Sequence, residues 1–229
     1  MALPWKILDR VATADGPLEL RQRGEEEFHI TVGGQILMNS MAHRSEAALG
    51  TLGCARLTAH AHPRVLVAGL GLGITLRAVL DALPASAEIV VAELNAIVVT
   101  WCRGPLASLT RGAVSDPRVK VQVADVAQVI RDAGKPGPRR FEAIILDLYT
   151  GPHRDSHPKS DPFYGSLAIE QARAALAPGG RLAVWGEAPD RAYQQRLEQA
   201  GFSVTLERPG RGGLRHVVYL AEQRGRAAR

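Results

Sequence analysis

The sequence of 229 residues has only two cysteines and no apolar run long enough to cross a membrane. Cys54 and Cys102 lie in segments with amphipathic helical spacing, so we expect two buried thiols rather than a disulfide or a nucleophile. A membrane-spanning helix needs roughly 20 apolar residues, and a charge at Lys6 interrupts the stretch that a signal peptide would keep apolar. We therefore expect a cytoplasmic protein without a membrane partner.

The body of the chain has little excess charge. The formal net charge is +5, and the segment from Arg208 onward accounts for all of it, with six arginines against Glu222. Phosphate binding needs several cations held on one surface, whereas a basic chain end of this kind is typical of a solvated tail. We expect a solvated tail, with RNA binding as the minor alternative.

Two kinds of motif are also missing. No GKS or GKT sequence is present, so the chain lacks the lysine-bearing loop that cradles phosphates. His153 and His157 are four residues apart, but Pro152 and Pro158 flank them, and no cysteine or further histidine accompanies them. Because a zinc site in a protein needs more ligands than this pair supplies, we expect no metal.

What the sequence contains is the composition of a globular protein, with 46% hydrophobic and 22% charged residues. Residues 1–44 hold short, partly alternating runs separated by Asp-Gly and Gly-Gly turn signals, which predicts a small antiparallel β unit. Helical spacing begins at Ser45, a residue type that often caps a helix. We expect the β unit over residues 1–44 and one larger domain over residues 45–229.

After Pro63 the pattern alternates between strands and helices. We predict strands at 64–69, 88–93, 119–124, 141–147 and 181–186, and helices at 72–83, 95–109, 125–133, 165–177 and 189–200. Two final apolar runs joined by glycines predict a terminal antiparallel hairpin. Nearly continuous apolar runs are typical of parallel strands covered by helices on both faces. The chain therefore predicts an α/β fold, a doubly wound, Rossmann-like seven-stranded sheet with a small N-terminal β unit.

Glycines or acidic residues end four successive strands of this sheet. Segment 69–73, GLGLG, precedes a helix, and glycines there let the backbone turn sharply and approach a ligand. Glu93 ends the second strand 20 residues later, a spacing typical of a carboxylate that binds a ribose. Asp125 and Asp147 follow the third and fourth strands. Since ligands bind beyond the carboxyl ends of such strands, the predicted cofactor-binding residues are Gly69, Gly71, Leu72, Gly73, Glu93, Leu94, Asp125, Val126 and Asp147.

Each of these positions also has a structural explanation. The glycines would serve helix packing, Glu93 would be an exposed charge at a strand end, and Asp125 would cap the next helix. Two cofactor classes compete for the layout. A nicotinamide site favours GxGxxG, but Ile74 stands at the third glycine position and no second mononucleotide half follows. The pattern favours a nucleoside such as S-adenosylmethionine.

Longer segments resemble one family. VLVAGLGLGITLRAVL, EIVVAELN, DPRVKVQVADV, FEAIILDLYTGP, DPFY and ALAPGGRLAVW follow, in order and at similar spacing, the motifs of the spermidine synthase family of aminopropyltransferases. This family is a branch of the class I S-adenosylmethionine-dependent methyltransferase superfamily. The resemblance spans residues 26–188 and implies the class I methyltransferase fold.

The resemblance implies two catalytic positions, and a third follows from its place in the sequence. Asp147 matches the aspartate that orients and deprotonates the attacking amine. Phe163-Tyr164 matches a pair that follows the loop over the active site, and Tyr149, two residues past Asp147, would line the acceptor pocket or pack under that loop. We predict Asp147, Tyr149 and Tyr164 as catalytic, and a homodimer by resemblance alone.

Three departures from the family concern charge. The family's first loop, GGGDGG, has an aspartate for the aminopropyl ammonium of decarboxylated S-adenosylmethionine, and Leu72 stands there. The second aspartate of the DSSDP-type signature is missing after Asp147. The loop 150–162 carries His153, Arg154, His157 and Lys159, which is more basic than a polyamine groove should be. A buried ammonium without a counter-charge costs several kcal/mol.

These departures favour intact S-adenosylmethionine, with methyl transfer to an amine or a similar small nucleophile. The alternative is a true aminopropyltransferase that uses decarboxylated S-adenosylmethionine. A third interpretation is a nucleoside-binding or interaction protein without turnover, although Glu93, Asp125 and Asp147 together argue against it.

Overall fold

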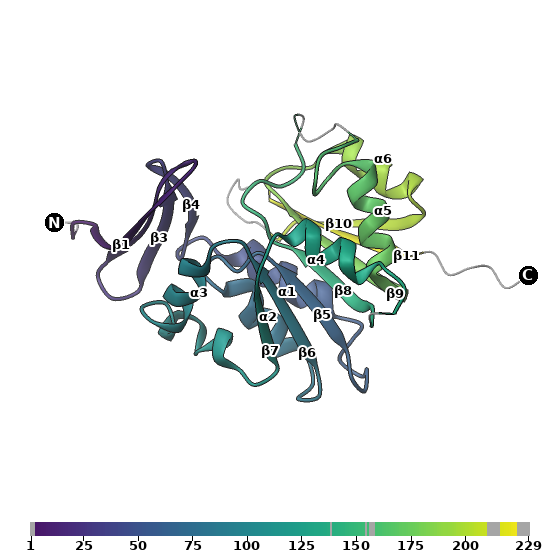
Figure 1. Cartoon of the computed structure of the whole chain (residues 1–229), viewed down its shortest axis with the longest axis horizontal. Helices are drawn as coiled ribbons and strands as arrows, with labels where there is room; N and C mark the ends of the chain where they lie inside the picture. Colours follow the sequence, from purple (N-terminus) through teal and green to yellow (C-terminus); the bar gives the residue numbers. More distant parts are fainter. Residues whose placement is uncertain (1–2, 138, 154, 156–158, 210–215, 224–229) are drawn as a thin grey trace, which may run out of the picture.

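The N-terminal part of the chain forms its own four-stranded sheet. The computed structural model describes residues 3–137, 139–153, 155, 159–209 and 216–223. The antiparallel strands lie in the order β1 (Lys6–Thr13), β2 (Gly16–Arg23), β3 (Glu27–Val32) and β4 (Gln35–Asn39). Figure 1 shows this sheet beside the rest of the molecule and next to α3, where the Trp101 Nε1 donates to Asp9 Oδ2 at 2.8 Å.

The remaining strands form one sheet of seven. They are β5 (Arg64–Ala68), β6 (Glu88–Glu93), β7 (Val119–Val123), β8 (Phe141–Leu146), β9 (Leu176–Gly186), β10 (Phe202–Glu207) and β11 (Val217–Gln223). Their order is β10-β11-β9-β8-β5-β6-β7, with β5 to β9 parallel and β11 antiparallel to both of its neighbours. The predicted doubly wound seven-stranded sheet, with its terminal hairpin, is confirmed.

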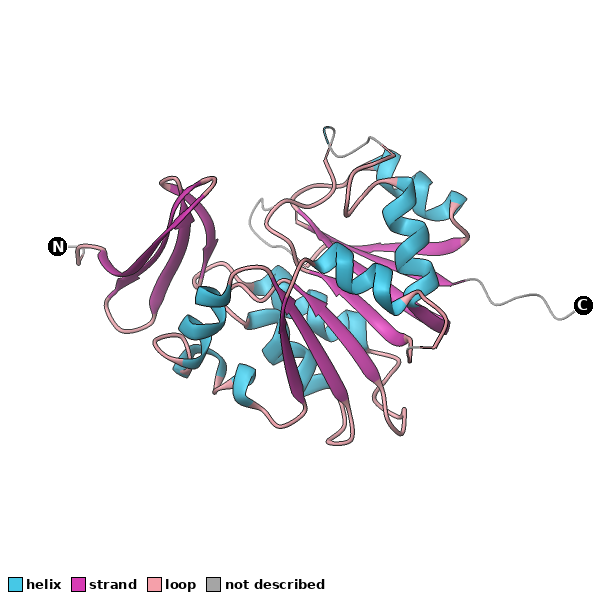
Figure 2. Cartoon of the chain, viewed as in Figure 1, coloured by secondary structure: helices cyan, strands magenta, loops and turns pink. Residues whose placement is uncertain are grey.

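Helices cover both faces of this sheet (Figure 2). They are α1 (Arg44–Cys54), α2 (Ile74–Ala82), α3 (Ala96–Arg103), α4 (Val126–Ala133), α5 (Ser166–Ala175) and α6 (Arg191–Gln199). Because successive strand residues point to opposite faces, Val65 and Val67 pack with α1, α2 and α3, whereas Leu66 and Ala68 pack with α4, α5 and α6. The N-terminal sheet adds Leu20 to the first of these cores.

Local differences from the expected elements have simple causes. The helix predicted over 95–109 ends at Arg103, because Pro105 follows and lacks the N–H that a helix interior needs. Ser45 does not cap α1, which begins one residue earlier with no side-chain cap. Both cysteines are buried as expected, and burial raises the pKa of each thiol to about 12. None of the described helices is long and apolar enough to span a membrane.

Candidate active site

A cavity of about 420 Å³ lies at the carboxyl ends of the parallel strands. The N-terminal sheet lines part of it through Leu18, Ile30, Leu37 and Met38, so this sheet covers a site built by the larger one. The predicted site residues that line the cavity are Gly69, Gly71, Glu93, Leu94, Asp125, Val126, Asp147 and Tyr149. Parallel pairing of β6, β5 and β8 brings these separate segments to one place.

The glycine loop is held in a shape that other residues do not adopt easily. Gly69 has φ of +91°, and a Cβ there would overlap the backbone oxygen of Asp147. A Cβ at Gly71, where φ is +51°, would overlap the sulfur of Met38. The loop therefore packs closely between the end of β8 and strand β4. Gly73 is the N-cap residue of α2 and does not line the cavity.

Glu93 fixes the loop while it lines the cavity. Its Oε2 accepts a hydrogen bond from the backbone N–H of Leu70 at 3.0 Å, and its Oε1 accepts one from Asn95 at 2.8 Å. Asp125 also has two roles, since its Oδ1 caps α4 by accepting from Ala127 N at 2.8 Å. A carboxylate has two oxygens with several lone pairs, so the cap leaves Asp125 able to accept from a ligand. The structural explanation of Asp125, as a helix cap, is thus compatible with the ligand-binding explanation.

Asp147 lies at the bottom of the site, on the end of β8. Its Oδ2 accepts a hydrogen bond from the Thr75 hydroxyl at 2.6 Å. The pKa of the Asp147 carboxyl is raised to about 7, mainly by burial and to a lesser degree by the nearby Glu46 charge, although the Thr75 hydrogen bond acts to lower it. A carboxylate with a pKa near neutrality is suited to accept a proton during a reaction.

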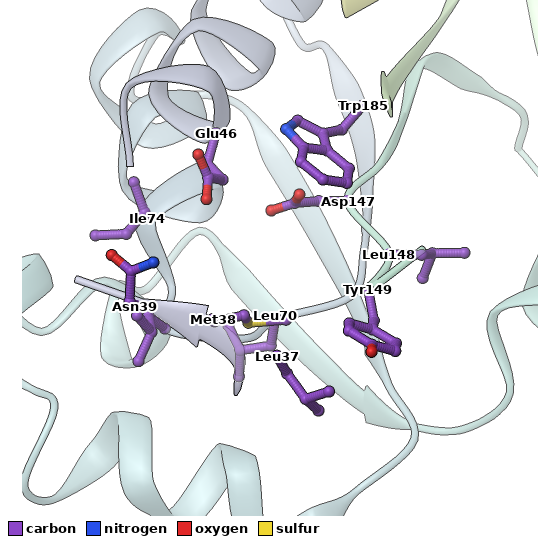
Figure 3. A pocket seen from close by; sticks show the side chains of 11 residues that line it. Leu37, Met38, Asn39, Glu46, Leu70, Ile74, Asp147, Leu148, Tyr149 and Trp185 are labelled. Atoms are coloured by element: carbon purple, nitrogen blue, oxygen red, sulfur yellow. The ribbon is translucent and has the colours of Figure 1, made fainter. Parts of the chain in front are cut away.

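A smaller pocket of about 60 Å³ adjoins the large cavity at Asp147 (Figure 3). The residues that line both are Leu37, Met38, Asp147, Leu148 and Tyr149. The small pocket is further lined by Asn39, Glu46, Leu70, Leu72, Ile74 and Trp185. A water needs about 10–15 Å³ of such space, so the pocket holds a group the size of an ammonium with part of its chain. Two carboxylates, Glu46 and Asp147, border an otherwise largely apolar space.

Sequence reasoning missed Glu46. It expected His43 and Arg44 at the surface, with substrate contact as the alternative, whereas the carboxylate that lines the small pocket lies two residues after Arg44, in the first turn of α1. Trp185, in β9, packs against the core and also lines the small pocket. An arginine and a glutamate two positions apart at the start of a helix carry no signal of which side chain faces the cavity.

The two predicted tyrosines separate in the structure. Tyr149 lines both pockets and is 52% exposed. Tyr164 lines neither and is buried: its hydroxyl donates to the backbone oxygen of Thr150, and its ring packs edge-on against Tyr193. Tyr164 thus packs beneath the loop and away from both pockets, and a catalytic role for it stays a prediction. Phe163, beside it, lines the large cavity.

The basic loop is only partly described. Arg154 and His157 lie outside the described residues, so the sequence argument about excess positive charge has no structural counterpart there. His153 lies in a separate cavity with Glu187 and Asp190. Among the described residues, no group of three or more histidine, cysteine or acidic side chains is placed to hold a metal ion.

The cavity lies at the carboxyl ends of a doubly wound sheet, with a glycine loop after one strand and acidic residues after the next two. This arrangement is that of the class I S-adenosylmethionine-dependent methyltransferase fold. The chain belongs to the spermine/spermidine synthase family: residues 51–195 match the spermine/spermidine synthase domain. The match includes α2 to α5 and every predicted cofactor-binding residue.

Relatives of similar sequence are named as polyamine aminopropyltransferases. The polyamine aminopropyltransferase of Mycobacterium tuberculosis strain H37Rv is 35% identical over 148 residues, which cover 62% of this chain and 27% of that protein. Polyamine aminopropyltransferase 1 of Hyperthermus butylicus is 36% identical over 115 residues, 50% of this chain and 35% of that protein. The aligned segment thus spans between about a quarter and a third of these relatives.

Solved structures share the fold. Spermidine synthase from Thermotoga maritima has a TM-score of 0.73 at 16% identity, covering 95% of this chain and 72% of that chain. A spermidine synthase in complex with the transition state analogue AdoDATO has a TM-score of 0.72 at 16% identity with the same coverage. At this identity the two structures show the shared fold alone. The names of the matched family and of the relatives above agree with aminopropyl transfer, the alternative in the sequence interpretation, and not with methyl transfer.

Replacing Glu93 by alanine is expected to weaken binding of 5′-methylthioadenosine by about 2 to 4 kcal/mol, because charge-assisted hydrogen bonds to the ribose are lost. Titration calorimetry measures the affinity. The matched control is Glu88→Ala, at the far end of the same strand, which removes a carboxylate paired with Arg64. Equal affinities of wild type and Glu93→Ala would place the ribose elsewhere. Thermal denaturation checks the fold, since Glu93 also holds Leu70 and Asn95.

Proposed function

We propose that this chain transfers an aminopropyl group from decarboxylated S-adenosylmethionine to an amine acceptor. The amine nitrogen bonds to the methylene carbon next to the sulfonium, and the carbon–sulfur bond breaks. Its electron pair stays on sulfur, which leaves as neutral 5′-methylthioadenosine. The nitrogen loses one proton, and Asp147 accepts it.

One observation carries the proposal: a nucleoside-sized cavity and a small pocket with two carboxylates meet at Asp147. The large cavity of about 420 Å³ is within the usual range of small-molecule sites, about 300 to 1,000 Å³. Glu93 and Asp125 supply acceptors for a ribose and an adenine amino group. The preference for methyl transfer depended in part on the absence of a counter-charge at Leu72, and Glu46 in the same pocket removes that part of the objection.

The remaining groups fit an in-line displacement. Asp147 stands where the two pockets join, so an amine beside it faces a donor in the large cavity. Holding nucleophile and electrophile in line supplies much of the rate of such reactions. Tyr149 lines both pockets and would close the apolar wall around the reacting groups. The names of the relatives and family agree with this chemistry. The homodimer stays a prediction.

The test is a comparison of donors with the full chain. We expect incubation with decarboxylated S-adenosylmethionine and a di- or triamine to release 5′-methylthioadenosine and add one aminopropyl group to the amine, as measured by mass spectrometry. Intact S-adenosylmethionine with the same amines should give no S-adenosylhomocysteine above the level without enzyme. Methylated amine in that second reaction, or no product from any amine in the first, would contradict the proposal.

A further inference from the structure

We propose that Glu46 is the counter-charge for a primary ammonium group of the substrates, and that it does from α1 what the family's aspartate does at the position of Leu72. The inference rests on the proposed aminopropyl transfer. Both residues line the small pocket, so a carboxylate on α1 and one in the glycine loop would face the same space. The charge is thus retained although the element that carries it has changed.

The surroundings of Glu46 hold it as an oriented anion. The Ser45 hydroxyl donates to Glu46 Oε2 at 2.7 Å, and the Ser45 oxygen lies 2.9 Å from Nδ1 of His216. A carboxylate only accepts, so the Ser45 proton points to Glu46 and His216 must donate through Nδ1–H. Ser45 is buried, and His216 packs edge-on against Trp185 at 5.0 Å. This chain of donors fixes the carboxylate before any ligand arrives.

Glu46 has no ion-pair partner among the described residues, although many other acidic side chains of the chain do. A carboxylate beside an apolar pocket loses hydration that an unpaired charge needs. The surrounding side chains, Leu70, Leu72 and Ile74, cannot replace that hydration. A bound alkylammonium would replace the lost hydration, since a charge-assisted hydrogen bond is roughly twice as strong as a neutral one.

Trp185 points independently to a polar ligand in the same pocket. Its indole nitrogen is fully buried and has no hydrogen-bond partner within the described part of the chain. Figure 3 shows this nitrogen on the side of the ring toward Glu46 and Asp147. Buried polar groups are nearly always bonded, so the space before it needs an acceptor. An ammonium only donates, and a water that accompanies the ammonium would accept from the indole N–H. An aromatic ring near a cation also attracts it.

The first experiment compares ligands with and without the ammonium. For Glu46→Gln we expect the affinity for decarboxylated S-adenosylmethionine to fall about 10- to 100-fold. The affinity for 5′-methylthioadenosine, which has no ammonium, should stay within about twofold of wild type, because it makes no contact with Glu46. Glu170→Gln, an exposed carboxylate on α5, is the matched control and should change neither value. A structural defect would lower both affinities together.

The second experiment moves the charge. Adding Leu72→Asp to Glu46→Gln should restore at least about tenfold of the lost affinity, because the carboxylate again borders the pocket. Leu72→Asn in the same background is the neutral control and should restore none. This double variant separates a charge requirement from a shape requirement at position 72.

The outcomes distinguish this inference from the proposed function. A rise of KM for the amine, with donor affinity unchanged, would assign the ammonium to the acceptor and still support Glu46 as its partner. Unchanged donor affinity and unchanged KM in Glu46→Gln, with an active wild type, would overturn the inference and leave aminopropyl transfer standing. A wild-type protein that neither binds decarboxylated S-adenosylmethionine nor turns it over would overturn both.

Discussion

Replacing Asp147 by asparagine is expected to lower turnover by about 10² to 10⁴, the usual contribution of a general base. Asparagine has nearly the same shape and its oxygen still accepts from Thr75, but it cannot take the proton from the attacking amine. Affinity for 5′-methylthioadenosine should change little. Steady-state assays give kcat, and titration calorimetry gives the affinity.

The pH profile adds a signature that a structural role would not produce. Asp147 must be ionised to accept a proton, and its pKa is raised to about 7. Wild-type turnover should therefore rise with pH through this value, and the residual activity of Asp147→Asn should lack that inflection. Asp132→Asn, an exposed carboxylate on α4, is the control. Turnover of Asp147→Asn within threefold of wild type would leave Asp147 a structural role and direct attention to Tyr149.

The second large effect is on stability. The pKa of Asp147 is raised to about 7 in the folded protein, mainly by burial, from a value near 3.8 in the unfolded chain. Between these values the folded state binds a proton that the unfolded state has lost, so stability falls as pH rises. We expect wild type to lose about 2 to 3 kcal/mol relative to Asp147→Asn between pH 5 and 8. Above about pH 8 the difference should level off.

Urea denaturation of both proteins across this range measures the difference directly. The control is Asp116→Asn, because the hydrogen bonds from Arg118 lower the pKa of Asp116. Its contribution is present above the unfolded pKa and is lost only as pH falls through the lowered one. Asp116→Asn should therefore show no slope relative to wild type from pH 5 to 8. Parallel curves for wild type and Asp147→Asn would mean that the folded protein does not hold Asp147 protonated at pH 5.

The carboxylate of Glu46, which lines the same pocket as Leu72, shows why counting charges along one motif misleads. Leu72 is buried in the glycine loop, and the motif alone indicates a lost ammonium site. The pocket is a property of several elements, and α1 and the end of β8 both contribute to it. Carboxylates on different elements make the potential in the pocket negative in the same way, provided that they line the same space.

The sequence by itself determined the order of elements and the ends of the strands. Apolar runs such as those of β5 and β8 are local patterns, and a parallel ladder places their carboxyl ends at one edge. Glu93, Asp125 and Asp147 could therefore be assigned to one site from their positions alone. The double role of Asp125 as helix cap and cavity residue also follows from its place between a strand and a helix.

Only the tertiary structure decided which other side chains reach that site. Glu46 meets Asp147 because α1 packs over the sheet beside α2, and helical periodicity does not reveal which residue of its first turn faces a distant strand. The position of Tyr164 also depends on tertiary packing. Its motif resembles an active-site pair, but its side chain packs in the core against Tyr193. Local patterns encode backbone direction and burial, whereas the meeting of side chains depends on how whole elements pack.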